Sequence, residues 1–122
     1  MRRGIYGASR TARAGLWRGL RNSGYPIISS WSDVEVVTDR GALLTRAFEE
    51  AANAERLIWL VEPEDFPFKI AWGEVCVALH AGVPVYIVVP RIVTDDQLGG
   101  LPSHRLVRRV ELSMALFGTR PQ

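Results

Sequence analysis

Five short apolar runs alternate along the chain with longer stretches in which apolar residues recur every three or four positions. The runs cover residues 4–8, 25–31, 56–61, 85–89 and 106–110. The run at 85–89 reads Val-Tyr-Ile-Val-Val, and such a continuous β-branched and aromatic run is typical of a central parallel strand covered on both faces. Strands that alternate with helices predict a parallel sheet with right-handed crossovers.

The stretches between the runs predict helices. Ser9, Arg10 and Thr11 open the first helix with a hydroxyl able to cap free backbone N–H groups, and a cap at Thr38 or Asp39 opens the second. The spacing predicts buried helix faces at Ala12, Leu16, Trp17 and Leu20, at Leu44, Phe48 and Ala51, and at Ala71, Val75, Ala78 and Leu79. A last short helix is expected over 111–116.

The order of these elements predicts a single α/β domain over residues 1–122. We expect a flavodoxin-like, doubly wound parallel sheet of five strands in the order 2-1-3-4-5, with helices on both faces. A chain of 122 residues is long enough for one such domain and too short for two.

Composition narrows the classes of partner. The net charge is only +2 and the charges are mixed along most of the chain, which argues against polymeric nucleic acid. No apolar run is long enough for a membrane span, and no signal-peptide pattern is present. The single cysteine excludes an internal disulfide and fits a reducing compartment, so we expect a cytoplasmic protein. His80 and His104 are too isolated to hold a metal, and we expect neither a metal nor another cofactor.

Polar and aromatic residues gather where the predicted strands end. Because the carboxyl ends of parallel strands meet at one rim of a sheet, we expect these residues to surround a ligand site there. The candidates are Tyr6, Ser9, Arg10, Trp31, Asp33, Glu62, Glu64, Asp65 and Glu74.

Each candidate also has a purely structural interpretation that the sequence leaves open. Glu74 is expected in the first turn of its helix, where it could simply compensate the helix N-terminus. Glu62 could be a solvated acid at a strand end, Asp33 a turn residue, and Tyr6 a core residue.

Two carboxylates with separate roles suit glycosidic-bond cleavage, in which one attacks the anomeric carbon and the other handles protons or sugar hydroxyls. Aromatic walls can stack on a base or a sugar. Ser9 and Arg10, at the opening of the first helix, would suit a 5′-phosphate. A carboxylate-centred site is therefore the chemistry that these residues favour.

Three motifs together resemble the nucleoside 2-deoxyribosyltransferase family. They are Ile-Tyr-Gly-Ala-Ser at 5–9, the acid that closes the third predicted strand, and Gly-Glu-x-x-x-Ala-x-x-x-Gly-x-Pro-Val at 73–85. The resemblance implies that Glu74 is the nucleophile, that Tyr6 orients it, and that Glu62 replaces an aspartate that contacts the base or assists its protonation. It also implies a homo-oligomer. One departure is Phe68, which stands where the family commonly has another aspartate and is a candidate substrate contact.

The function expected from this resemblance is N-glycosidic-bond cleavage or transfer on a (deoxy)nucleoside or nucleoside monophosphate. Whether a second base or water resolves the intermediate is left open by the sequence. Phe68 in place of an acid favours a second hypothesis, a non-catalytic nucleotide-binding module. A weaker third hypothesis is an interaction domain that uses Phe66 and Phe68.

Overall fold

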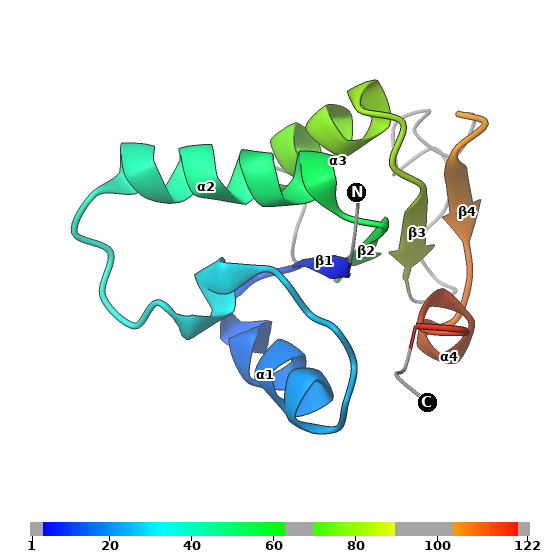
Figure 1. Ribbon diagram of the computed structural model, residues 1–122, viewed down its shortest axis with the longest axis horizontal. Coiled ribbons are helices and arrows are strands. Elements are labelled where there is room, and N and C mark those ends of the chain that lie inside the picture. Colours follow the sequence, from blue (N-terminus) through cyan, green and yellow to red (C-terminus); the bar gives the residue numbers. More distant parts are fainter. Residues whose placement is uncertain (1–3, 63–69, 90–103, 120–122) are drawn as a thin grey trace.

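The computed structural model describes residues 4–62, 70–89 and 104–119, and its four parallel strands form one sheet (Figure 1). In chain order the elements are β1 (Ile5–Ala8), the 3-10 helix η1 (Thr11–Arg13), α1 (Ala14–Asn22), the 3-10 helix η2 (Ser30–Asp33), α2 (Arg40–Asn53), β2 (Arg56–Leu60), α3 (Ile70–His80), β3 (Val85–Val88), β4 (Val107–Arg109) and α4 (Leu112–Ala115). Within the described ranges, no helix has the length and apolar character that crossing a bilayer requires.

The strands lie in the order β1-β2-β3-β4, and every neighbouring pair is parallel. Ile5 pairs with Arg56, and Val85 lies between Leu57 on one side and Val107 on the other. The prediction of an all-parallel α/β sheet with interleaved helices is confirmed, and the β-branched run at 85–89 forms the inner strand β3.

The second predicted strand does not form. Residues 25–31 make only one parallel bridge, between Ile27 and Ile5, on the outer side of β1. Beyond it the N–H of Gly7 donates to the hydroxyl of Ser29 at 3.1 Å, and the indole of Trp31 donates to the Gly7 carbonyl at 2.7 Å. Side chains thus take the backbone groups that a strand would use, and the expectation of five full strands was wrong.

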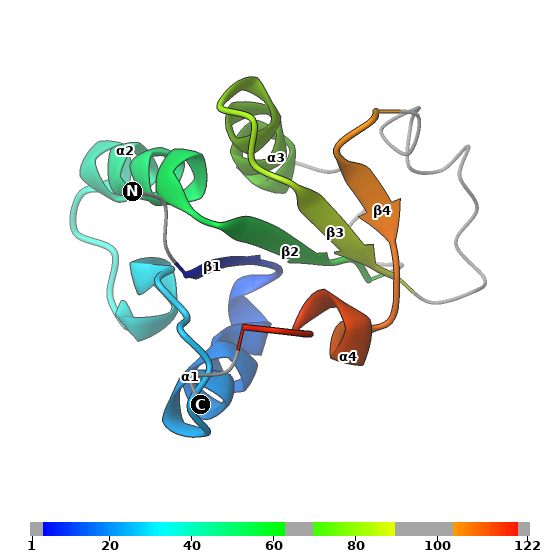
Figure 2. The same cartoon turned by 45° about the vertical axis from the view of Figure 1, so that its right-hand side comes forward.

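Side chains alternate between the two faces of the sheet. Leu57 and Trp59 of β2 point into a core shared with α2 and α3, whereas Ile58 packs in a second core with Trp17 of α1. Figure 2 shows α2 and α3 on one side of the sheet and α1 and α4 on the other. Two covered faces explain why the inner strands are apolar at successive positions.

The helix faces match the prediction in part. Asp39 caps α2 by accepting from the Ala42 N–H at 3.0 Å, and Val75 and Ala78 of α3 are fully buried, both as predicted. On α2, Ala51 is fully buried as predicted, but Leu44 is 36% exposed and Ala47 is buried in its place.

The first helix differs more from expectation. It begins as η1, and neither η1 nor α1 has a side-chain cap. Its one fully buried residue is Trp17, while Leu16 is 39% exposed. The predicted hydroxyl cap was therefore wrong.

Candidate functional site

Tyr6 of β1 and Glu74 of α3 form a buried pair. The Tyr6 hydroxyl donates a hydrogen bond to Oε2 of Glu74. Tyr6 is fully buried and Glu74 is 6% exposed. The two residues that the sequence singled out from distant positions therefore meet on the face of the sheet that α2 and α3 cover.

Close helix packing supports this position of Glu74. A Cβ on the preceding residue, Gly73, would lie 2.9 Å from Cζ of Phe48 in α2, so a glycine there lets α3 approach α2. On the same helix, Trp72 makes an edge-on contact with Trp59 of β2, with ring centroids 6.0 Å apart. These contacts fix α3 against both its neighbouring helix and the sheet.

The structure rules out the interpretation of Glu74 as a helix-terminus charge. α3 already begins at Ile70 and has no acid in its first turn. The expected first-turn position of Glu74 was therefore wrong, and its carboxylate lies too far along the helix to compensate the N-terminus.

Burial perturbs the ionisation of both members of the pair. It raises the pKa of Glu74 to about 7, although the hydrogen bond from Tyr6 acts in the opposite direction. Burial also raises the pKa of Tyr6, and the charges of Glu74 and Glu50 and the hydrogen bond to Glu74 add to the rise. A carboxyl that exchanges its proton near neutral pH is a common feature of functional sites.

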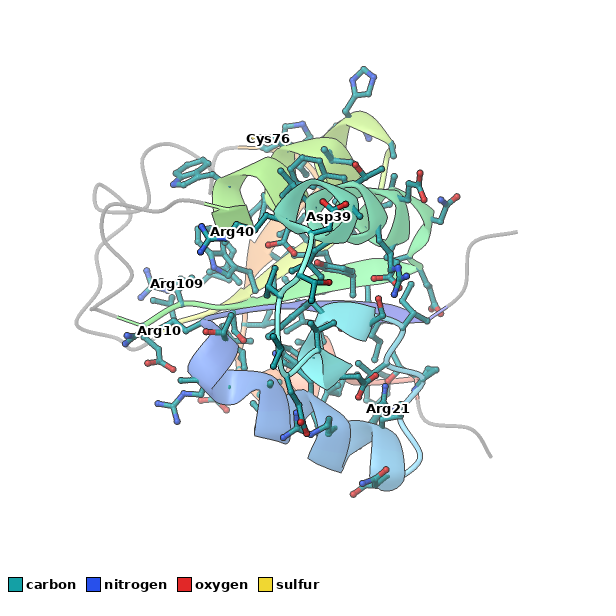
Figure 3. All side chains as sticks on the ribbon, turned by 90° about the vertical axis from the view of Figure 1, so that its left-hand side faces the viewer. Arg10, Arg21, Asp39, Arg40, Cys76 and Arg109 are labelled. Carbon is teal, nitrogen blue, oxygen red and sulfur yellow. The ribbon has the colours of Figure 1, made fainter. Side chains whose placement is uncertain are left out.

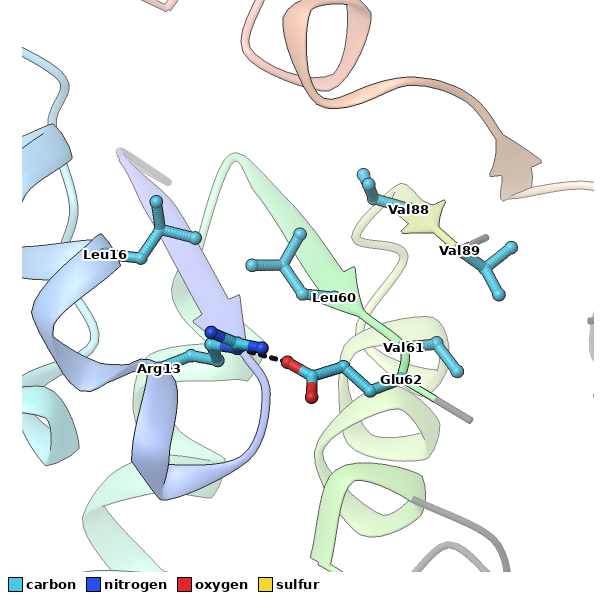
Figure 4. A pocket seen from close by; sticks show the side chains of 7 residues that line it. All are labelled: Arg13, Leu16, Leu60, Val61, Glu62, Val88 and Val89. Atoms are coloured by element: carbon cyan, nitrogen blue, oxygen red, sulfur yellow. Dashed lines mark hydrogen bonds and ion pairs between the residues drawn. The ribbon is translucent and has the colours of Figure 1, made fainter. Parts of the chain in front are cut away.

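A separate cavity of about 450 Å³ lies at the carboxyl ends of β2 and β3 (Figure 4). Its described lining is mostly aliphatic and consists of Arg13, Leu16, Leu60, Val61, Glu62, Val88 and Val89. Neither Tyr6 nor Glu74 lines it. We call it the strand-end cavity.

Glu62 is held by arginines at the edge of the strand-end cavity. Nε of Arg13 donates to its Oε1, and a guanidinium nitrogen of Arg10 lies 3.7 Å from its Oε2. The hydrogen bond from Arg13, followed by the charges of Arg13 and Arg10, lowers the pKa of Glu62. Glu62 is therefore an ion-paired acid at a strand end.

Ser9 and Trp31 already hold partners inside the chain. The Ser9 hydroxyl accepts from the Trp17 indole at 2.8 Å and donates to the Arg10 carbonyl at 3.1 Å. Trp31 is partly buried, bonds to Gly7 and packs against both cores. Both residues thus help to shape the end of β1.

Asp33 lies apart from the other candidates. Its carboxylate forms a two-pronged ion pair with Arg21, with oxygen–nitrogen distances of 2.6 and 2.9 Å. Arg21 is in the last turn of α1, whereas Arg10 precedes η1, and Figure 3 shows these two arginines at opposite ends of that segment. Phe66, Phe68, Glu64 and Asp65 lie outside the described residues.

Two residues near the site were not singled out by the sequence. One is Arg13, whose spacing of three from Arg10 could have placed both arginines on one side of a helical turn. The other is Glu50, whose Oε1 accepts from both the N–H and the hydroxyl of Ser30 at 3.0 Å. No sequence pattern indicates this second contact, because it depends on how α2 packs against η2.

Within residues 4–62, 70–89 and 104–119, no cluster of three or more His, Cys, Asp or Glu side chains has the arrangement of a metal site. In comparisons with protein-family models, with curated proteins and with solved structures, the chain has no match.

Proposed function

We propose that the chain cleaves or transfers the N-glycosidic bond of a (deoxy)nucleoside or nucleoside monophosphate, with Glu74 as the nucleophile. The observation that carries this proposal is the buried hydrogen bond between Tyr6 and Glu74. Keeping an acid in an apolar core is unfavourable, and Glu74 compensates no helix terminus there. This unfavourable placement supports a chemical role for Glu74.

In the first step a carboxylate oxygen of Glu74 forms a bond to the anomeric carbon of the sugar. The bond from that carbon to the base nitrogen breaks, and its electron pair leaves with the base, which takes a proton from solvent. In the second step another base or a water attacks the same carbon and releases the carboxylate, and the attacking nitrogen or oxygen gives up its proton to solvent. The Tyr6 hydroxyl orients the attacking oxygen through its hydrogen bond.

Within this proposal Glu62 binds the base and does not protonate it. Its lowered pKa keeps it ionised at neutral pH, so it is an acceptor for the N–H groups of a base. Arg10, beside Glu62, remains the candidate for contact with a 5′-phosphate.

The test measures base released from deoxynucleosides and their 5′-monophosphates by wild type, Glu74→Gln and Glu62→Gln. We expect turnover by wild type and a loss of at least about a thousandfold in Glu74→Gln, because the nucleophile is gone. Activity should rise with pH up to about 7, since the nucleophile must be ionised and the pKa of Glu74 is about 7. Turnover that Glu74→Gln leaves unchanged would refute the proposal.

The strand-end cavity favours a second candidate, a non-catalytic nucleotide-binding module. The volume of about 450 Å³ suits a small ligand, and the lining residues do not include the nucleophile candidate. Calorimetry with a nucleoside monophosphate, followed by chromatography of the mixture, separates the two. Binding without product that is lost in Arg13→Ala and retained in Glu74→Gln would favour the module.

A flavodoxin-like assignment and a homo-oligomeric state belong to the same proposal. The bridge from Ile27 to the outer side of β1 supports the first, because it places residues 25–31 where the second of five strands would lie. The second rests on the family resemblance.

A further inference from the structure

Glu50 is an acidic residue on the side of α2 that faces the sheet. Ala47 of α2, and Ala54 directly after it, are buried in the core that also contains Tyr6. Glu50 lies three positions after Ala47 and four before Ala54, so it shares their side of the helix. Its side chain is partly buried, whereas its neighbour Glu49 is exposed. A carboxylate therefore borders the core in which Tyr6 meets Glu74.

One oxygen of Glu50 is held and the other is open. Oε1 accepts from the N–H and the hydroxyl of Ser30, both at 3.0 Å. The residue before it, Ser29, bonds the N–H of Gly7, so these contacts tie Glu50 to the end of β1. Within residues 4–62, 70–89 and 104–119, Oε2 of Glu50 has no hydrogen bond or ion pair. A carboxylate oxygen has two lone pairs, so Oε2 can accept from a ligand.

The charge of Glu50 also acts on the buried pair. It adds to the rise in the pKa of Tyr6, after the larger effects of burial and of Glu74. Because Tyr6 donates to Glu74, two carboxylates from two helices lie near one phenol. Figure 2 shows these helices, α2 and α3, on the same side of the sheet. A glutamine at position 50 could accept both bonds from Ser30 without a second negative charge here, so the tie alone does not require an acid.

We propose that Glu50 binds the sugar of the substrate, with Oε2 accepting a hydrogen bond from the 3′-hydroxyl. This inference rests on the proposed function, in which Glu74 attacks the anomeric carbon and the sugar ring lies beside it. The 3′-hydroxyl is the ring hydroxyl that nucleosides and 2′-deoxynucleosides share. A carboxylate accepts from a hydroxyl and repels a phosphate, so Glu50 selects a sugar whose 3′ position carries a free hydroxyl.

The test compares 2′-deoxyadenosine and thymidine with their 2′,3′-dideoxy analogues by calorimetry. We expect wild type to bind the 3′-hydroxyl form at least about tenfold more tightly, because the analogue loses a hydrogen bond to a charged group. Glu50→Ala should bring this ratio near one. Glu50→Gln, which can keep the bonds from Ser30, should give an intermediate ratio.

Two controls separate the open oxygen from its surroundings. Glu49→Ala removes the exposed acid next in the helix, and Ser30→Ala removes a donor to Oε1 while leaving Oε2 in place. Both variants should keep the wild-type ratio. A fall in the ratio as large as that in Glu50→Ala would overturn the inference, because loss of an acid on the helix or of the tie would then suffice.

The remaining outcomes also decide the question. The inference is overturned if wild type binds neither form, does not distinguish them, or has a ratio that both Glu50 variants leave unchanged. Base release measured in the same samples keeps the two proposals apart. A ratio that depends on Glu50 without any turnover refutes the glycosidic proposal and supports this one. Turnover that is lost in Glu74→Gln, with a ratio unaffected by Glu50, does the reverse.

Discussion

Replacing Glu74 with glutamine should stabilise the fold at alkaline pH and leave it almost unchanged at acid pH. The amide oxygen of glutamine can still accept the hydrogen bond from Tyr6, so the substitution removes the ionisation and keeps the contact. The pKa of Glu74 is about 7 in the folded chain against an ordinary value of 4.5. At 1.36 kcal/mol per pH unit, this difference corresponds to about 3 kcal/mol.

The sign follows from proton binding. Between pH 4.5 and about 7 the folded chain keeps the Glu74 proton and the unfolded chain loses it. The wild type therefore loses free energy of unfolding as the pH rises through this interval, and the loss levels off above it. Glutamine cannot ionise, so the advantage of the variant grows from near zero to about 3 kcal/mol.

Urea unfolding of both proteins, monitored by tryptophan fluorescence on either side of this interval, measures the effect. With ordinary denaturant slopes the midpoint of Glu74→Gln should exceed that of wild type by about 1–3 M on the alkaline side. Glu62→Gln is the matched control, because the pKa of Glu62 is lowered and its loss should not stabilise the fold. A difference between wild type and Glu74→Gln that is the same at both pH values would refute the reasoning.

Three further substitutions test the surroundings of the site. Tyr6→Phe removes the hydrogen bond that lowers the pKa of Glu74, so the pH interval over which stability falls should extend above 7, as the same urea series would show. Gly73→Ala should destabilise by about 1–3 kcal/mol through overpacking against α2. Gly19→Ala, whose new methyl would meet no atom within 4 Å beyond its chain neighbours and its own helix backbone, should be neutral or stabilising by up to about 1 kcal/mol, and thermal unfolding compares the two variants. Asp39→Ala should cost about 1 kcal/mol by removing the cap of α2, and an unchanged melting temperature would contradict that role of the carboxylate.

The strands could be predicted from the sequence where their residues are buried on both faces. The run at 85–89 is unambiguous because every side chain in it favours a pleated, covered strand. The run at 25–31 looks similar, but Ser29 and Trp31 use their side chains to bond Gly7 and the ladder stops. Competition between a hydroxyl and a backbone group is decided by tertiary geometry, which periodicity does not report.

The sequence predicted the buried part of the candidate site, which is the pair of Tyr6 and Glu74. Tyr6 and Glu74 meet as expected, because the Tyr6 side chain of β1 points to the face of the sheet that α3 covers. The start of α3 could not be predicted, because nothing in the sequence marks Ile70 as its first residue. A later start would place Glu74 in the first turn of the helix. The hydrogen bond from Arg13 to Glu62 joins residues that are far apart in the sequence. It depends on tertiary packing, which the sequence pattern does not report.

Residues 26–31 hydrogen-bond to the outer edge of β1, and this contact affects the tendency of the chain to aggregate. An open sheet has two edge strands, and an edge strand with unpaired backbone N–H and C=O groups can pair with a strand from another molecule and start aggregation. On the β1 margin Ile5 bonds to Pro26 and Ile28 at 2.8 and 2.9 Å, while Gly7 is occupied by Ser29 and Trp31. Among the described strands the opposite edge is β4, which is only three residues long and carries two exposed arginines, Arg108 and Arg109. The β1 edge is thus hydrogen-bonded within the chain, and the β4 edge is short and charged. Neither of these edges favours the addition of a strand from another molecule.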